Sequence, residues 1–228
     1  MWVHNADCCD LNIGANNANY SNTAHKNISN RAGNGDVIDR SLSRKALGNY
    51  TIEPFNLTSS KAYKDLKTDK ERKEFISHYT RQVKCQEEAI NSLSPDELLS
   101  AIDAHKQSGR ESPENQRAFT KKFKRNLQTT IEKSICGKPQ YKNLSQAEIK
   151  KYAKDRTEEI ASKLAALHDP DQVVGGHFSD IKHMGSRSNN GAIGGGWADG
   201  KRVSQLQEAA EKLKKSGATK MNISLTIK

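Results

Sequence analysis

Four helix starts between residues 68 and 148 constrain the fold of this chain more than any other feature. Thr68 and Glu71 have the spacing of a capping box, in which the hydroxyl and the carboxylate each accept a hydrogen bond from a backbone amide that lacks a partner in the helix. At two other starts a proline follows a serine, and proline favours the first position of a helix. The predicted starts are Thr68, Ser94, Ser112 and Ser145.

Apolar residues follow each start at spacings that place them on one helical face. They are Phe75, Ile76, Tyr79, Val83 and Ile90, then Leu98, Leu99 and Ile102, then Phe119, Phe123, Leu127, Ile131 and Ile135, and finally Ile149, Tyr152, Ile160, Leu164 and Leu167. Four amphipathic helices in a row predict a helical layer.

The pattern changes at His168. Residues 168–201 contain eight glycines, few apolar side chains and no helical period. Because a loop of this length in a compact domain is usually functional or disordered, we expect a long glycine-rich active-site loop here.

The C-terminal part ends in a short helix and a strand. The helix is expected from about Ser204 to Lys215, and apolar and polar residues alternate from Met221 to Ile227 as in a strand with one buried face. A single strand needs a partner, which we place around residues 192–197. The predicted fold class is therefore α+β, a mainly α-helical layer with a small C-terminal β-sheet and the glycine-rich loop.

Residues 1–60 differ in composition from residues 61–228. They are rich in Asn, Ser and Gly and have few periodic apolar positions, which predicts an irregular segment that docks in places through Trp2, Ile13 or Phe55. Residues 61–228 form the predicted domain.

The chain carries an excess of positive charge. The 228 residues include 37 Lys and Arg against 27 Asp and Glu, a net charge of +10. Such an excess favours an anionic partner, first nucleic acid and then an acidic protein or an anionic membrane surface.

No stretch approaches the roughly 18 apolar residues of a membrane-spanning helix, and the N-terminus lacks the pattern of an export signal. The four cysteines have neither zinc-site nor disulfide-framework spacing, so Cys85 and Cys136 are interpreted as core thiols.

His168 and Asp171 are the strongest candidates for catalysis. Phosphodiester hydrolysis needs a base for the attacking water and usually a cation held by carboxylates. Imidazole suits the first task and aspartate the second. Asp169 adds a further carboxylate for a divalent cation, which we expect to be Mg²⁺. The structural alternative is a histidine that complements a helix dipole, followed by an Asx turn.

Other residues are weaker candidates for the site. An inward-facing Glu87 adds a third acidic group, and the basic side chains near the glycine-rich stretch are expected to contact phosphates together with backbone amides. The predicted phosphate- or DNA-binding residues are Lys182, Arg187, Asn190 and Arg202. His177 and His183 are interpreted as polar loop residues, because no acidic or cysteine partner stands at convincing spacing.

Several ordered blocks resemble the polymorphic toxin type 15 domain family. The blocks are Arg81–Gln82, Gln86–Glu87, Asn91, residues 94–110, the Ala166–Gly176 stretch with its His-x-x-Asp pair, and Met184 to Trp197 with the C-terminal strand. The resemblance covers residues 75–228. Asp169 stands where the family usually has Asn, and Gly191, Gly195 and Gly196 replace polar residues.

The resemblance implies an antibacterial effector that degrades DNA and uses His168 and Asp171 as its catalytic pair. It also implies production in the bacterial cytoplasm, delivery by a type VI secretion carrier or adaptor into the cytoplasm of a competitor, and a cognate immunity protein. Three alternatives stay open: an RNase toxin of the same architecture, a basic DNA-binding module without catalysis, and a toxin that perturbs membranes through its amphipathic helices.

Overall fold

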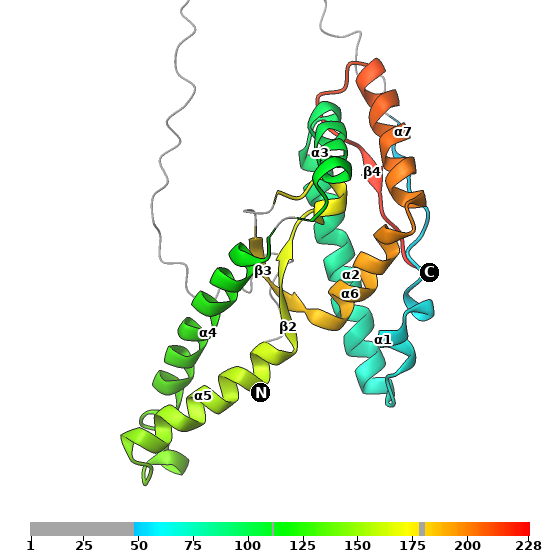
Figure 1. Ribbon diagram of the computed structural model, residues 1–228. Coiled ribbons are helices and arrows are strands. Elements are labelled where there is room, and N and C mark those ends of the chain that lie inside the picture. The colour runs from blue at the N-terminus through cyan, green and yellow to red at the C-terminus, as the bar shows by residue number, and fades with distance from the viewer. Residues whose placement is uncertain (1–47, 111, 178–180) are drawn as a thin grey trace, which may run out of the picture.

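The computed structural model describes residues 48–110, 112–177 and 181–228 and has a mainly helical α+β fold (Figure 1). The helices are α1 (Lys61–Lys64), α2 (Asp69–Ser92), α3 (Pro95–Ser108), α4 (Glu114–Ile135), α5 (Gln146–Ser162), α6 (Arg187–Ala198) and α7 (Lys201–Lys215). The strands are β1 (Tyr50–Thr51), β2 (Leu164–His168), β3 (Ile181–Ser186) and β4 (Ile223–Ser224), and the 3₁₀ turns are η1 (Leu57–Ser59), η2 (Pro139–Tyr141) and η3 (Gln172–Val174). The predicted fold class is confirmed, apart from the glycine-rich loop discussed below.

Three of the four predicted helix starts, Thr68, Ser94 and Ser145, are confirmed, whereas the start predicted at Ser112 lies one residue later. Thr68 accepts a hydrogen bond from the amide of Glu71 in a complete capping box, and the same arrangement begins α3 at Ser94 and α5 at Ser145. In α4, Pro113 is the N-cap residue, and no side chain accepts a hydrogen bond from the first amides of this helix. Local hydrogen bonds decide these boundaries, so the local sequence predicts them well.

The main core lies between α2, α3, α6 and α7, and the segments at both ends of the described chain join it. Its largest fully buried side chains include Trp197, Tyr79, Phe55, Ile52, Ile90 and Leu98. Phe55 packs edge-on against Trp197, with the ring centroids 5.0 Å apart. The predicted docking of Phe55 is confirmed, whereas Trp2 and Ile13 lie outside the described residues.

The partner predicted for the C-terminal strand is wrong. β4 pairs in parallel with β1 and not with residues 192–197, and Phe55 forms a further bridge to Ile227. The side chain of Asn91 on α2 fixes the strand by donating to the carbonyl of Ile223 and accepting from its amide, both at 2.9 Å. Pairing between residues more than 170 positions apart leaves no local signal, so the sequence did not reveal it.

The predicted fourth helix is shorter than expected. It ends at Ser162, and residues 164–168 form β2, which pairs antiparallel with β3. A short apolar run fits a helix or a strand equally well, and here pairing with a distant segment decides for the strand.

The predicted long glycine-rich loop is also wrong, because most of it forms β3 and α6. Ser186 caps α6 by accepting a hydrogen bond from the amide of Asn189. Asn189, Ile193 and Trp197 are buried and lie four residues apart. This spacing is a helical signal that the many glycines obscured.

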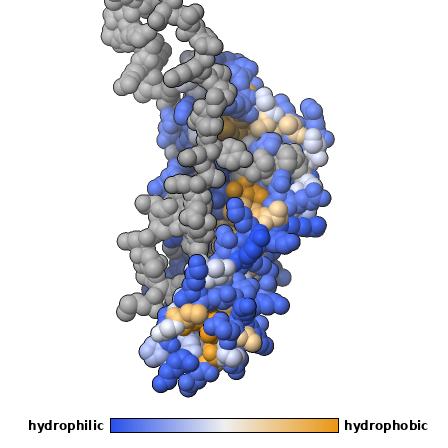
Figure 2. Space-filling view, turned by 90° about the vertical axis from the view of Figure 1, so that its left-hand side faces the viewer, coloured by the Kyte–Doolittle hydropathy of each residue, from blue (hydrophilic) through white to orange (hydrophobic). Residues whose placement is uncertain are grey.

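Helices α4 and α5 form an antiparallel arm that extends away from the main core (Figure 1). The arm meets the rest of the molecule chiefly through the β2–β3 ribbon. Figure 2 shows that the described surface on one side of the molecule is mostly hydrophilic, with small hydrophobic patches, one of them at the lower end where the arm lies. The ribbon is therefore the joint between arm and core.

We expect Phe55→Ala to lower the free energy of unfolding by about 3–5 kcal/mol, because it leaves a cavity beside Trp197 in the main core. Urea denaturation of the full chain measures the change. Ile76→Ala, at a position that is 42% exposed, is the control and is expected to cost about 0.5 kcal/mol or less. Equal losses for the two variants would contradict the assignment of residues 48–60 to the folded core.

Candidate active site

A cavity of about 550 Å³ contains both residues of the predicted His-x-x-Asp pair. It lies between the start of α4, the end of β2, the turn after β2 and one face of α6. The lining residues are Arg110, Pro113, Gln116, Ala166, His168, Asp171, Gln172, Asn190, Gly191, Gly194, Gly195 and Ala198.

His168 reaches the cavity because it is the last residue of β2. Side chains alternate along a strand, so Ala166 and His168 face the cavity while Leu167 is buried on the other face. His168 as a whole residue is 9% exposed. Its Nδ1 lies 3.4 Å from the amide nitrogen of Gln116, and its Nε2 lies 3.5 Å from that of Gln172. These contacts are long for hydrogen bonds, so either amide can give way to water or substrate.

Asp171 is held in the turn that follows. Its Oδ1 accepts a hydrogen bond of 3.1 Å from the amide of Val173 and caps η3. The Asx turn of the structural alternative is therefore present, but the helix-dipole part is wrong, because His168 ends a strand and not a helix. The capping bond orients the carboxylate while leaving it at the wall of the cavity.

Gln86 on α2 fixes the turn between these two residues. Its Nε2 donates to the carbonyl of His168 at 2.9 Å and to Oδ1 of Asp169 at 2.8 Å. Its Oε1 accepts from the amide of Asp171 at 2.6 Å. Gln86 is 6% exposed, so these bonds form away from water. Gln86 was not among the predicted site residues, although it stands in one of the blocks that carry the family resemblance.

The face of α6 that lines the cavity consists largely of glycines and carries few side chains. Cβ atoms added at Gly191 or Gly195 would meet no other atom within 4 Å, and one at Gly194 would meet only the guanidinium of Arg110. These glycines therefore leave open space in the cavity that His168 also lines. The family resemblance implies polar side chains at Gly191 and Gly195, so glycine at these two positions enlarges the cavity.

A basic groove of about 610 Å³ continues from the cavity along α4. It shares Arg110, Gln116 and Asn190 with the cavity. The cationic side chains along it are Arg110, Arg117, Lys121, Lys124 and Arg187. Lys124 forms an ion pair with Glu158 across the arm.

Two of the predicted phosphate-binding residues lie in this region. Arg187 lines the groove and also donates to the carbonyls of Ser162 and Leu164, which close the end of α5. Asn190 lines both the groove and the cavity.

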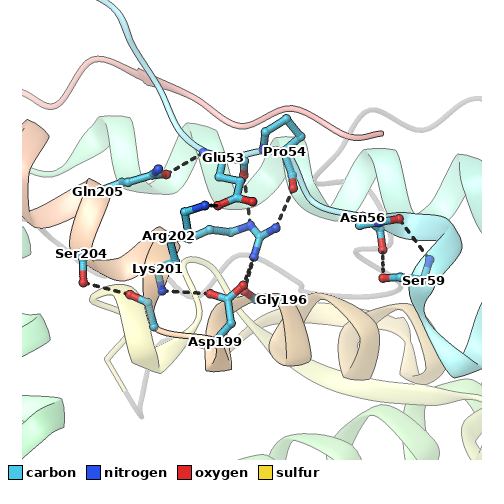
Figure 3. Close-up of polar contacts among 11 residues, drawn as sticks. Glu53, Pro54, Asn56, Ser59, Gly196, Asp199, Lys201, Arg202, Ser204 and Gln205 are labelled. Atoms are coloured by element: carbon cyan, nitrogen blue, oxygen red, sulfur yellow. Dashed lines mark hydrogen bonds and ion pairs between the residues drawn. The ribbon is translucent and has the colours of Figure 1, made fainter.

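The prediction for Arg202 is wrong. Its side chain is 5% exposed and donates to the backbone carbonyls of Glu53, Pro54 and Gly196 and to the carboxylate of Asp199, as Figure 3 shows. Its guanidinium also lies 4.7 Å from the centre of the Phe55 ring. Arg202 therefore stabilises the contact between the N-terminal segment and α6–α7.

Glu87 and Lys182 also lie elsewhere. The carboxylate of Glu87 accepts a hydrogen bond of 2.6 Å from the amide of Leu225 and is absent from the lining of the cavity, so the expectation of a third acidic group there is wrong. Lys182 is exposed and lines a different cavity.

Asp169 does not share a site with Asp171, contrary to the prediction. It lines the cavity that contains Lys182, and its Oδ2 lies 3.3 Å from Nδ1 of His183. Burial raises the pKa of Asp169, while His183 and the hydrogen bond from Gln86 act in the opposite direction. The two carboxylates of the motif therefore have different surroundings.

Comparison with known families gives the class of this protein: it contains a toxin domain. The sequence model that matches is that of Ntox15, Novel toxin 15, over residues 73–228. Since the match covers more than half of the chain, the chain belongs to this family, and the predicted resemblance is confirmed. Comparison with curated proteins finds no match.

The matched region does not include all of the folded chain. Residues 50–57 lie before it, yet they supply β1 and the buried side chains of Ile52, Phe55 and Leu57. Within the described parts of the chain, none of the helices combines the length and the hydrophobicity that a membrane span needs.

We expect Gln86→Ala to lower the free energy of unfolding by about 1–3 kcal/mol, because it leaves the buried carbonyl of His168 and the partly buried amide of Asp171 without this partner. Thermal denaturation measures the effect. Gln107→Ala, on the exposed face of α3, is the matched control and is expected to change stability little. A loss no larger than that of the control would show that Gln86 does not hold the turn.

Proposed function

We propose that this toxin domain is a nuclease that hydrolyses DNA phosphodiester bonds at His168 and Asp171. The observation that carries the proposal is that both side chains line one cavity, which continues into a basic groove. The His-x-x-Asp motif and a cluster of cationic side chains thus lie next to each other in the molecule.

His168 is the proposed general base, or it orients the attacking water. Each ring nitrogen contacts a glutamine amide at a distance that is long for a hydrogen bond. A water molecule or a phosphate oxygen can therefore take the place of either amide. A neutral imidazole can accept the proton from water near neutral pH. The open space in front of the α6 glycines is where the scissile phosphate fits.

Asp171 is the proposed ligand of a divalent cation, or it positions His168. The cavity offers one carboxylate, and Mg²⁺ is commonly bound by one or two carboxylates together with water and substrate phosphates. The donor set therefore fits Mg²⁺ bound with its substrate. Such a cation stabilises the negative charge that develops on the phosphate.

The basic groove is the proposed path of the nucleic-acid backbone. Five cationic side chains line it, and Lys and Arg contribute to affinity by neutralising phosphates. The net charge of +10 supports the same substrate class.

Membership of a toxin family supports a wider role in competition between bacteria. In this role the chain is made in the bacterial cytoplasm, leaves with a type VI carrier or adaptor and acts in the cytoplasm of the target cell. A nuclease is dangerous to the cell that makes it, so a cognate immunity protein is the expected partner.

The first test is plasmid cleavage by the full chain in Mg²⁺. We expect nicking by the wild type and a cleavage rate at least roughly 100-fold lower for His168→Ala and Asp171→Asn. General base catalysis contributes a rate enhancement of at least about this size, and each variant is expected to lose it. His78→Ala and Asp103→Asn, at exposed positions, are the matched controls and are expected to cleave normally. Equal cleavage by wild type and both site variants excludes the assignment.

The same assay with RNA separates the nearest alternative, since cleavage of RNA but not DNA indicates an RNase. Salt-sensitive binding of intact DNA, unchanged by His168→Ala, indicates a binding module without catalysis. Dye release from anionic vesicles, with no cleavage of nucleic acid, indicates a membrane-active toxin.

A second test addresses the groove. In a His168→Ala background, which avoids cleavage, we expect Arg117→Ala with Lys121→Ala to weaken DNA binding and to reduce the slope of log K against log salt by about 2. Lys64→Ala with Lys67→Ala, both at exposed positions, is the control pair. Fluorescence anisotropy at several salt concentrations gives the slopes, and equal slopes for the two pairs contradict the proposed path.

A further inference from the structure

Three side chains of metal-binding type converge away from the His168 cavity. They are Cys85, Asp169 and His183, and one ligand atom of each lies within 4.8 Å of those of the other two. They form the one such cluster in the parts of the chain that the structure describes. Sequence spacing does not reveal this cluster, because 98 positions separate the first residue from the last. The interpretation of His183 as a polar loop residue is wrong, since it lies on β3.

The fold brings the three residues together from three different elements. Cys85 lies on the face of α2 that carries Gln82 and Gln86, which bond to Ser186 and to the His168–Asp171 turn respectively. His183 lies on β3 opposite Leu167, and cross-strand partners share one face of a ribbon. Since Leu167 and His168 point to opposite faces, the cluster and the catalytic cavity lie on opposite sides of the ribbon.

The cluster is enclosed. Cys85 is 5% exposed, and the side chains of Asp169 and His183 are 9% and 13% exposed. Asp169 is already oriented by the hydrogen bond from Gln86 and lies against His183. A metal would therefore meet two ligands whose positions are largely set.

We propose that Cys85, Asp169 and His183 form a zinc site. A thiolate, an imidazole and a carboxylate are the ligand types of Zn²⁺, and the thiolate selects against Mg²⁺. At usual Zn–S and Zn–N lengths, tetrahedral ligand atoms lie roughly 3–4 Å apart, so small side-chain rotations close the cluster around an ion.

The adjoining cavity, of about 960 Å³, supplies the fourth position. Glu88 and His177 line it together with the three proposed ligands, so water or either side chain can complete the tetrahedron. Because Asp169 follows His168 directly, the bound ion stabilises the turn between His168 and Asp171 from the side opposite the His168 cavity. Its role is structural, since it lies on the side of the ribbon away from the catalytic cavity.

The test is a titration of the full, reduced chain with Co²⁺, a spectroscopic substitute for Zn²⁺. We expect one equivalent to produce the near-ultraviolet charge-transfer band of a Co²⁺–thiolate bond, and Zn²⁺ to abolish it. Cys85→Ser is expected to remove the band, and His183→Gln to weaken binding at least roughly 10-fold, within the range seen when metal ligation is perturbed.

The controls separate this site from other thiols and from the proposed nuclease. Cys136→Ser, Cys8→Ser with Cys9→Ser, and His78→Gln are expected to keep the band. His168→Ala and Asp171→Asn are also expected to keep it, so the zinc site can stand if the proposed nuclease activity fails, and the reverse holds as well.

Two outcomes overturn the proposal: a folded wild type with no thiolate band, or a band that persists in Cys85→Ser. In either case the residues are a buried ion pair beside a core thiol. If Cys85→Ser fails to fold, the melting temperature of Asp171→Asn decides, because a ligand that binds only the folded state raises it and this variant lacks the proposed Mg²⁺ ligand. A melting temperature of this variant that rises with Zn²⁺ but not with Mg²⁺ supports the zinc site, and any other response overturns it.

Discussion

The hydrogen bonds of Gln86 are the interaction on which the candidate site depends. A single buried amide group joins α2 to the carbonyl of His168 and to the amide of Asp171, so it holds both ends of a turn that lacks regular structure of its own. Buried backbone groups need partners, and a helix packed behind the ribbon supplies them. The relative positions of His168 and Asp171 are thus set by a helix of the main core.

Helix α6 shows why a glycine-rich stretch can be ordered and still leave room for a substrate. Ile193 and Trp197 anchor one face in the core, and Gly196 lies so close to Phe55 that an added Cβ would be 2.6 Å from the ring. The opposite face bears Gly191 and Gly195, where a Cβ would meet nothing. Glycine lowers the intrinsic stability of a helix, so packing of the anchored face must compensate for the open one.

The sequence predicts what depends on neighbours along the chain and misses what depends on distant partners. Capping boxes predicted the starts of α2 and α5, and the His-x-x-Asp spacing predicted the pair that shares a cavity. The strand identity of residues 164–168 and the pairing of β1 with β4 are set by contacts across the fold. Arg202 failed as a phosphate ligand for the same reason, since its carbonyl partners come mainly from residues 53–54.

The alternation of side chains along β2 and the turn after it assigns the two carboxylates of the motif to different surroundings. Asp171 lines the open cavity with His168, whereas Asp169 lies on the far side with Cys85 and His183, and burial raises the pKa of Asp169. An Asn at position 169, as the family resemblance implies, could still accept the hydrogen bond from Gln86. It could not supply a charged ligand to a cation. The Asp in this chain therefore adds nothing to the proposed hydrolysis directly, and its value lies in what the far side of the ribbon can bind.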